Sequence, residues 1–173
     1  SAPGIGLLAS GSGNIPAFPA LNTGTAPVVA NITVVPHFTV GAVTCDGPSQ
    51  TFTITVNPSA NINDLTNQIV CNGSPTTAVS FGTANTLGTT TYTWTNNATS
   101  IGLASGGTGD IGIFTATNTG SSPVTATITV TPHFENAGVV CDGPAKTLTI
   151  TVNPTAQVND PADQVICNGS LTN

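Results

Sequence analysis

The feature that most constrains the fold of this chain is an internal repeat. The segment Cys141–Pro154, CDGPAKTLTITVNP, occurs in nearly the same form at Cys45–Pro58 as CDGPSQTFTITVNP. The same spacing of 96 residues relates equivalent positions from Ile5 to Cys167, and no insertion or deletion interrupts it. A period of this length is too long for stacked solenoid units and matches an independent domain of immunoglobulin size. The sequence therefore predicts one domain per repeat, with the domains following one another along the chain.

The repeat also predicts where the domains begin and end. The closing Asn-Pro of each copy should stop a strand, because proline cannot donate to a β-ladder. On this basis residues 1–58 are the C-terminal part of one domain, residues 59–154 are one complete domain, and residues 155–173 begin a third. The polar segment 59–67 follows a proline and has no strand-like periodicity, so it is predicted to connect two domains.

Strands are predicted from alternating apolar and polar residues. Val124–Thr131 alternates valine, alanine and isoleucine with threonine, which indicates a strand with one buried and one solvent-facing side. Pro132 is expected to end or bend this strand. Thr147–Val152 alternates in the same way, and Tyr92 and Trp94 lie two residues apart in a threonine-rich run, so both should face the core.

Shorter segments complete the predicted architecture. Gln68–Cys71 and Ala78–Phe81 are interpreted as short strands, and Ile111–Asn118 has strand-like spacing. No segment has the apolar pattern of an amphipathic helix, and turn signals lie close together. The predicted fold class is therefore all-β, with tandem immunoglobulin-like β-sandwich domains of about seven strands per 96-residue repeat.

The charge of the chain excludes several classes of partner. Lys146 is the only basic residue apart from two histidines, and seven acidic residues give a formal net charge of −6. Such a chain cannot neutralise a row of phosphates, so we expect neither nucleic acid nor an anionic membrane as a partner. No apolar run approaches the roughly 20 residues that span a bilayer, so no membrane insertion is expected.

Four cysteines allow three pairings. Pairing the equivalent residues Cys45 and Cys141 would join points a domain apart, beyond the Cα separation of about 7 Å that a disulfide tolerates, and the same holds for Cys71 and Cys167. Pairing Cys45 with Cys71 would require the chain to double back. The simplest prediction is a Cys71–Cys141 disulfide that tethers the first strand of the complete domain to the entry of its last strand. Cys45 and Cys167 would then pair outside residues 1–173, and free buried thiols are the alternative.

Metal and cofactor sites are not predicted. His37 and His133 occupy the same Pro-His-Phe context, and they are interpreted as structural histidines because no clustered ligands accompany them. Asp64 and Asp160 lie in the two connections beside asparagines, where oxygen ligands could hold calcium. One carboxylate per connection is few for a calcium site, so Asx turns are the preferred interpretation and calcium the alternative.

Catalysis is not predicted either. The chain has no GxSxG nucleophile elbow and no catalytic or cofactor-binding constellation, so we expect a protein that is not an enzyme. Lys146 is replaced by Gln50 in the earlier copy, so an internal lysine cross-link cannot be general to the repeats. Glycosylation sequons, interpreted as incidental in this Asn/Thr-rich chain, begin at Asn31, Asn72, Asn97 and Asn168.

The ordered motifs QIVCNGS, TTYTWT, ASGGTGDI, PVTATITVTP and CDGPAKTLTITVNP resemble a known type of repeat. They are similar to the PKD-like repeats of very large surface adhesins that Bacteroidetes secrete through the type IX system, including gliding-motility adhesins. The resemblance covers the complete repeat and both partial ones. It implies an immunoglobulin-like β-sandwich in a long extracellular filament at the cell surface, and it implies no catalytic residues.

The predicted function is therefore a non-enzymatic structural or adhesive repeat of a secreted filament or stalk. Its partners would be neighbouring repeats of the same chain, other copies in a filament, and a surface or polysaccharide ligand that the sequence does not identify. The alternative is a carbohydrate-binding module, which would need Trp94 exposed in an aromatic groove. In a third hypothesis, the segment that begins the third domain completes a neighbouring chain's partial domain by strand addition. The two partial repeats together fall short of a full one, so a continuous chain is the preferred interpretation.

Overall fold

The computed structural model describes residues 4–171, and the outermost residues of the two partial repeats, 1–3 and 172–173, lie outside this range. Over the described residues the chain is all-β, as predicted, with a single 3₁₀ turn at Thr99–Ile101. The first repeat contains β1 (Val28–Val34), β2 (His37–Val40), β3 (Val43–Asp46) and β4 (Gln50–Val56). The second repeat contains β5 (Gln68–Cys71), β6 (Thr89–Asn96), β7 (Gly106–Thr108), β8 (Val124–Asn136), β9 (Val139–Asp142) and β10 (Lys146–Asn153).

The second repeat is built on one six-stranded sheet. Its strand order is β5-β10-β8-β6-β7. The short strand β9 pairs with the last four residues of β8, His133–Asn136. The β5–β10 pair is parallel, whereas the other pairs are antiparallel. Irregular segments face this sheet and are joined to one another by two isolated bridges, Pro75 to Thr115 and Val79 to Ile111. The arrangement is consistent with a β-sandwich whose second layer is mostly irregular.

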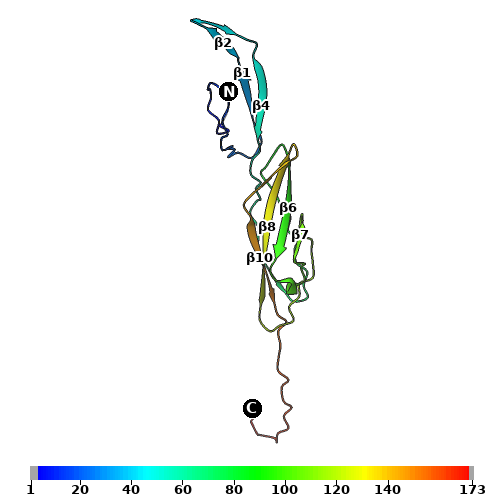
Figure 1. Cartoon of the computed structure of the whole chain (residues 1–173). Helices are drawn as coiled ribbons and strands as arrows, with labels where there is room; N and C mark the ends of the chain where they lie inside the picture. The colour runs from blue at the N-terminus through cyan, green and yellow to red at the C-terminus, as the bar shows by residue number, and fades with distance from the viewer. Residues whose placement is uncertain (1–3, 172–173) are drawn as a thin grey trace.

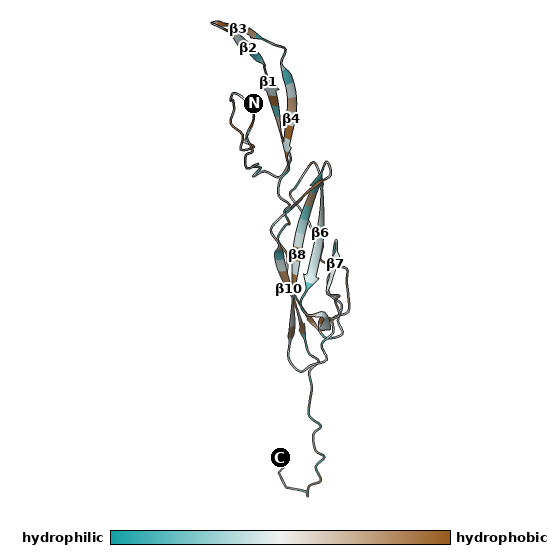
Figure 2. Ribbon diagram, viewed as in Figure 1, coloured by the Kyte–Doolittle hydropathy of each residue, from teal (hydrophilic) through white to brown (hydrophobic). Residues whose placement is uncertain are grey.

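The core of the second repeat lies between the sheet and the irregular segments. Val124, at the start of β8, is partly buried against the core. The other residues of β8 and β10 that were predicted to face inward are buried, which confirms the alternation: Ala126, Ile128, Val130, Leu148, Ile150 and Val152. Tyr92 and Trp94 of β6 are each 8% exposed, so the predicted inward direction of both aromatic residues is also confirmed. Figure 2 shows the corresponding mixture of hydrophilic and hydrophobic colours along the strands.

Proline at the end of the PVTATITVTP motif has different consequences in the two repeats. In the second repeat β8 continues through Pro132, because β6 pairs along its length and places Tyr92 opposite that proline. In the first repeat the strand breaks at the equivalent Pro36, between β1 and β2. Within residues 4–171 no strand pairs with β1 as β6 pairs with β8. Pro132 therefore does not end its strand, contrary to one of the two predicted outcomes, whereas the equivalent Pro36 separates β1 from β2.

Other expectations about local structure also need correction. Ala78–Phe81 and Ile111–Asn118 contribute single bridges to the irregular layer and are not strands of the sheet. Segment 59–67 is more than a connection, because Ala60 and Ile62 are buried and Ile62 belongs to the core of the second repeat. The apolar residues of this segment, Ala60, Ile62 and Leu65, are too few and too unevenly spaced to indicate a strand or a buried face.

The two repeats follow one another along an elongated molecule, and the C-terminal residues extend beyond the second repeat (Figure 1). Reciprocal amide contacts join them at the junction. Asn57 Nδ2 donates to the Asn136 carbonyl at 3.2 Å, and Asn136 Nδ2 donates to Asn57 Oδ1 at 2.9 Å. The Thr86 N–H also donates to the Thr25 carbonyl at 2.9 Å. The junction is therefore made by hydrogen bonds between the end of β4 and the β8–β9 turn, and between two loops.

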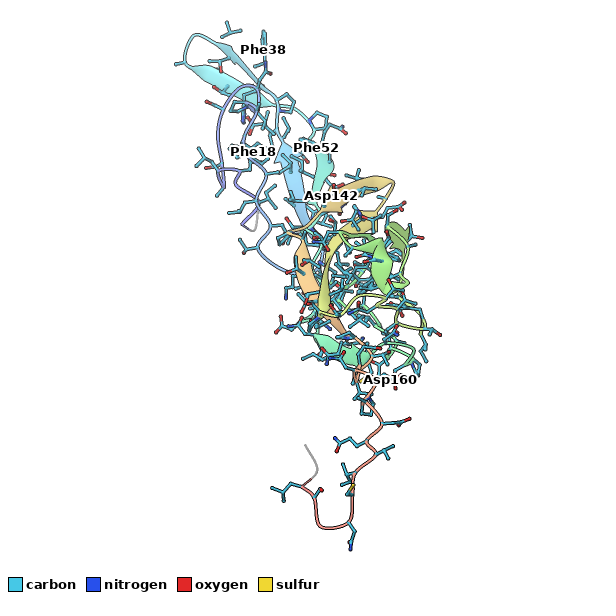
Figure 3. The ribbon with its side chains drawn as sticks, turned by 90° about the horizontal axis from the view of Figure 1, so that it is seen from below. Phe18, Phe38, Phe52, Asp142 and Asp160 are labelled. Atoms are coloured by element: carbon cyan, nitrogen blue, oxygen red, sulfur yellow. The ribbon has the colours of Figure 1, made fainter. Side chains whose placement is uncertain are left out.

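The first repeat has a much smaller core than the second. Its fully buried apolar cluster consists of Ile5, Ala30 and Val56. Phe52 of β4 is 45% exposed, whereas the equivalent Leu148 of β10 is 1% exposed. Phe38 lies near the far tip of the molecule, whereas Phe18 and Phe52 lie closer to the second repeat (Figure 3).

Candidate functional site

The structure corrects the predicted Cys71–Cys141 disulfide. Both cysteines are free thiols. Cys71 lies opposite Asn153 at the last residue of β10, whereas Cys141 pairs with Phe134, beyond the other end of that strand. From the strand rise of about 3.3 Å per residue, the two lie roughly 35 Å apart along the sheet, far outside disulfide range. The predicted disulfide requires Cys71 of β5 to lie near the N-terminal end of β10, which Cys141 precedes. Because β5 and β10 are parallel, Cys71 lies instead beside the C-terminal end of β10.

The other two cysteines form no disulfide within residues 4–171. Cys45 lies in the exposed β2–β3 hairpin and Cys167 in the C-terminal segment, and both are exposed. The predicted pairing of these two with cysteines outside residues 1–173 stays a prediction.

The two carboxylates considered for calcium lie in different surroundings. Asp64 Oδ1 accepts a hydrogen bond of 2.6 Å from Lys146 Nζ, so its charge already has a cationic partner. The neighbouring Asn61 Oδ1 accepts from the Thr83 hydroxyl and the Ala84 N–H. Asp160 lies where the C-terminal segment leaves the second repeat (Figure 3), and it is exposed. Within residues 4–171 no three His, Cys, Asp or Glu side chains gather as metal ligands would.

The pair of Asp64 and Lys146 gives a testable consequence. The hydrogen bond and the positive charge of Lys146 hold the pKa of Asp64 below its ordinary value of 3.8. A lowered carboxylate pKa stabilises the fold above the unfolded-state pKa, and the contribution is lost as pH falls through the folded-state pKa. In Lys146→Gln, which introduces the residue found at Gln50, we expect the pKa of Asp64 to rise to its ordinary range. Side-chain NMR titration measures it, and an unchanged pKa would contradict the contact.

A histidine–aspartate pair that was not predicted from the sequence recurs in both repeats. His37 Nδ1 lies 2.6 Å from Asp46 Oδ1, and His133 Nδ1 lies 2.6 Å from Asp142 Oδ1. In the second repeat the Thr93 hydroxyl also lies 2.9 Å from His133 Nε2. The signal that could have revealed the pair is its recurrence, since both members keep their places in the two copies.

The order Thr93, His133, Asp142 is that of a nucleophile, a base and an orienting carboxylate. Its surroundings do not resemble an active site. Thr93 lies in the middle of β6, where the neighbouring backbone pairs with β7 and β8, and an oxyanion would need N–H donors directed at the reacting carbonyl. The pair also recurs in the first repeat, where the described residues hold no β6 equivalent. We interpret it as a polar link across the β8–β9 and β2–β3 hairpins.

An asparagine organises the same turn in each repeat, buried in the second and half-buried in the first, and it too was missed. Asn118 Nδ2 donates to the carbonyls of Ser122 and Val152 at 2.9 and 2.8 Å. Asn22 Nδ2 donates to the equivalent carbonyls of Ala26 and Val56 at 2.9 and 2.8 Å. Each side chain ties the turn before the long strand to the end of the last strand. Recurrence at 96 residues was again the available signal.

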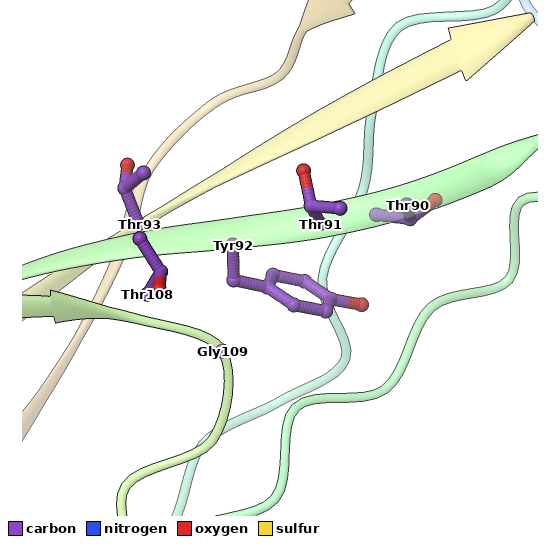
Figure 4. Close-up of a pocket in the computed structure, with 6 residues that line it drawn as sticks. All are labelled: Thr90, Thr91, Tyr92, Thr93, Thr108 and Gly109. Atoms are coloured by element: carbon purple, nitrogen blue, oxygen red, sulfur yellow. The ribbon is translucent and has the colours of Figure 1, made fainter.

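Trp94 and Tyr92, the aromatic residues considered for carbohydrate binding, are buried by neighbouring residues of the second repeat. Trp94 is 8% exposed, and its indole packs so closely on Gly107 of β7 that an added Cβ would lie 2.5 Å from the ring. A shallow pocket lies over β6 and the loop after β7 (Figure 4), lined by Thr90, Thr91, Tyr92, Thr93, Thr108 and Gly109. The Tyr92 ring packs at a centroid distance of 5.3 Å against Phe81. Neither aromatic residue presents an open ring face of the kind on which sugars stack.

Burial of Tyr92 can be measured directly, because it is the only tyrosine in the chain. Burial raises its pKa above the ordinary 10.0, and nearby Asp110 adds to the rise, against a hydrogen bond with Thr83 that lowers it. A raised pKa stabilises the fold below the unfolded-state value, and the contribution is lost as pH rises through the folded-state value. We expect ultraviolet titration of the phenol to have a midpoint above 10.0. A midpoint at or below that value would indicate an exposed ring.

Comparison of the chain with protein-family models, curated proteins and solved structures finds no match. The described residues contain no helix that is long and apolar enough to cross a membrane.

Proposed function

We propose that this chain is a non-enzymatic structural or adhesive part of a long extracellular filament, made of tandem immunoglobulin-like, PKD-like repeats. The observation that carries the proposal is the junction between two sequence-related repeats, where Asn57 and Asn136 exchange hydrogen bonds. Asn153 occupies the position of Asn57 one repeat later, so the same contact can recur at the next junction. If the same contact forms at every junction, once per 96-residue repeat, successive repeats join into a linear array.

The surface of the second repeat supports this proposal. Threonines cover the solvent-facing side of β8 and β10, and Thr125 and Thr151 pair through their hydroxyl groups at 2.9 Å. Such a surface is polar without being charged, which suits a stalk that must stay solvated beside many copies of itself. A stalk of this kind would act outside the cell, and the matched repeats agree with the resemblance to secreted surface adhesins.

The alternative of a carbohydrate-binding module receives less support. It requires an exposed aromatic face, and Trp94 and Tyr92 pack into the core. The pocket over β6 is lined mainly by threonines, which could hydrogen-bond a sugar but offer no stacking platform.

The proposal is tested by extending the chain with further copies of residues 59–154 and imaging the particles. We expect particle length to grow by a constant increment of roughly 35–45 Å per added copy, set by the length of the long strands. A matched series with Asn136→Ala in every copy should bend more at each junction. Particles that become wider without becoming longer would contradict the proposal.

A further inference from the structure

We propose that loop 82–88 of the second repeat is a docking surface for the repeat before it and for the linker, residues 57–63, and that Asn85 makes this joint rigid by binding backbone groups. The inference rests on the proposed function. It adds the surface through which one repeat holds its neighbour and the way in which that surface recognises its partner.

Asn85 lies at the centre of the loop and is only 9% exposed. Its Oδ1 accepts hydrogen bonds from the Asn61 N–H at 2.7 Å and from the Thr83 hydroxyl at 3.0 Å. Its Nδ2 donates to the Ser59 carbonyl at 3.1 Å and to the Thr25 carbonyl at 3.4 Å. An asparagine amide offers two donor hydrogens and two acceptor lone pairs, and all four are used here. The side chain therefore joins the first repeat, the linker and the second repeat at one point.

The backbone of the loop contacts the same partners. The Thr86 N–H donates to the Thr25 carbonyl at 2.9 Å, beside the contact made by Asn85. Towards the other end of the loop, the Asn63 N–H donates to the Gly82 carbonyl at 2.8 Å. The loop is therefore bonded to the first repeat near one end and to the linker at the other.

The linker itself is packed against the second repeat. Every second residue from Pro58 through Ala60 to Ile62 is buried, whereas Ser59 between two of them is exposed. Ala60 lies so close to Gly143 that a Cβ added there would meet the Ala60 carbonyl oxygen. Freely moving segments have few buried contacts, so a linker buried in this way is not a free hinge.

The backbone at Leu87 supports a loop shaped by its contacts. Leu87 has a φ of 59°, a left-handed conformation that leucine rarely adopts. Its side chain is 77% exposed, so packing of that side chain does not hold it there. The residues on either side are fixed, since Thr86 is bonded to Thr25 and Gly88 lies against the buried ring of Phe134. Contacts with both repeats thus hold the strained residue between them.

The docking surface recognises its partner mainly through backbone groups. Thr25 and Ser59 are both exposed, and the loop binds the carbonyl of each. The equivalent residues one repeat later are Ser121 and Thr155, which change the side chains but keep the carbonyls. A surface that binds carbonyls accepts any repeat whose backbone follows the same path, so repeats that differ in sequence can follow one another.

Asn61 of the linker is recognised through its side chain as well. Its Oδ1 accepts from the Thr83 hydroxyl at 2.9 Å and from the Ala84 N–H at 2.8 Å. The equivalent residue in the next linker is Gln157, which keeps the amide on a longer side chain. The identity of this residue can therefore adjust the joint, whereas the side chains at positions 25 and 59 should not.

Amide hydrogen exchange in the intact 173-residue chain tests the joint at named atoms. Asn85→Asp keeps an acceptor oxygen for the Asn61 N–H but replaces the donor Nδ2 with a charged oxygen that faces two carbonyls. We expect the Thr86 N–H to exchange about tenfold faster or more, because its hydrogen bond spans the joint. The Gly109 N–H donates to the Tyr92 carbonyl within the second repeat and should change by less than about twofold. Equal changes at the two amides, or no change at either, would overturn the role of Asn85.

Thr25→Ala and Ser59→Ala are the matched variants on the partner side of the joint. Each removes an exposed side chain and keeps the carbonyl, so exchange of the Thr86 N–H should stay within about twofold of its original rate. A change as large as that caused by Asn85→Asp would overturn recognition through the backbone.

Residual dipolar couplings measure whether the joint is rigid. We expect one alignment tensor to fit the amides of both repeats in the unsubstituted chain, and two different tensors to be needed for Asn85→Asp. In the control Asn118→Asp one tensor should still fit, because Asn118 also donates to two carbonyls but both lie in the second repeat. An unshifted Trp94 emission shows that the second repeat stays folded in each variant.

Two tensors for the unsubstituted chain, in a particle that scattering shows to be elongated, would overturn the rigid joint and leave the proposed function standing. A compact particle would overturn the proposed function.

Discussion

Phe134→Ala is expected to destabilise the second repeat by about 3–5 kcal/mol, the usual cost of removing a buried phenylalanine ring. Phe134 is 0% exposed, and its ring lies against Gly88 so closely that a Cβ there would be 2.3 Å from the ring. Denaturant unfolding followed by fluorescence measures the change, because Trp94 is the only tryptophan and reports on this repeat alone. A change below about 1 kcal/mol would mean that the ring is not buried.

The first repeat offers a matched control for this variant. Phe38 occupies the same Pro-His-Phe motif, but it is 71% exposed because the described residues of the first repeat have no equivalent of Gly88 or β6. Phe38→Ala should therefore change the free energy of unfolding by no more than about 0.5 kcal/mol. Calorimetry suits this comparison, because it detects both repeats. Equal losses from the two substitutions would contradict the difference in packing.

Gly143→Ala is expected to have an effect of similar size for a different reason. An alanine Cβ at this position would lie 1.7 Å from the backbone oxygen of Ala60, which is itself buried. Relief requires the backbone around Ala60 to move, and this backbone continues into the core at Ile62. We expect a loss of roughly 3 kcal/mol, at the upper end of overpacking costs, measured by the Trp94 signal.

Gly112→Ala is the control for that substitution. Nothing lies within 4 Å of a Cβ built at Gly112, and its φ is not in the left-handed region. Its effect should stay within about 0.5 kcal/mol, helped by the lower entropy of the unfolded chain. If Gly143→Ala proved equally mild, the close approach of the two backbone segments would be wrong.

The strands could be predicted where apolar residues alternate with threonine along the sequence. The threonine and apolar alternation of Val124–Thr131 and Thr147–Val152 is a local signal, and the structure buries the residues that it selected. The continuation of β8 through Pro132 could not be predicted, because it depends on pairing with β6, a strand far away in the sequence. The identical proline in the first repeat, without that partner, breaks its strand.

The candidate site was less predictable, because its geometry depends on which strands are neighbours. The predicted disulfide was wrong because β5 pairs with β10 in the parallel direction. The spacing of residues in the sequence does not reveal the direction of this pairing. Asp64 could be singled out as a carboxylate in a connection, but its contact with Lys146 spans 82 residues. The His133–Asp142 pair and the buried Asn118 were recoverable in principle, because each recurs in the first repeat.

Small-angle X-ray scattering of the intact chain at low concentration measures whether the two repeats stand end to end in solution, as the proposed filament requires. Each repeat is about 44 Å long if set by a 13-residue strand such as β8. Two in line give a radius of gyration of roughly 26 Å for the rod, before the C-terminal segment adds to it. We expect this value or a larger one. A value near 16 Å, expected for a compact domain of 173 residues, would contradict it.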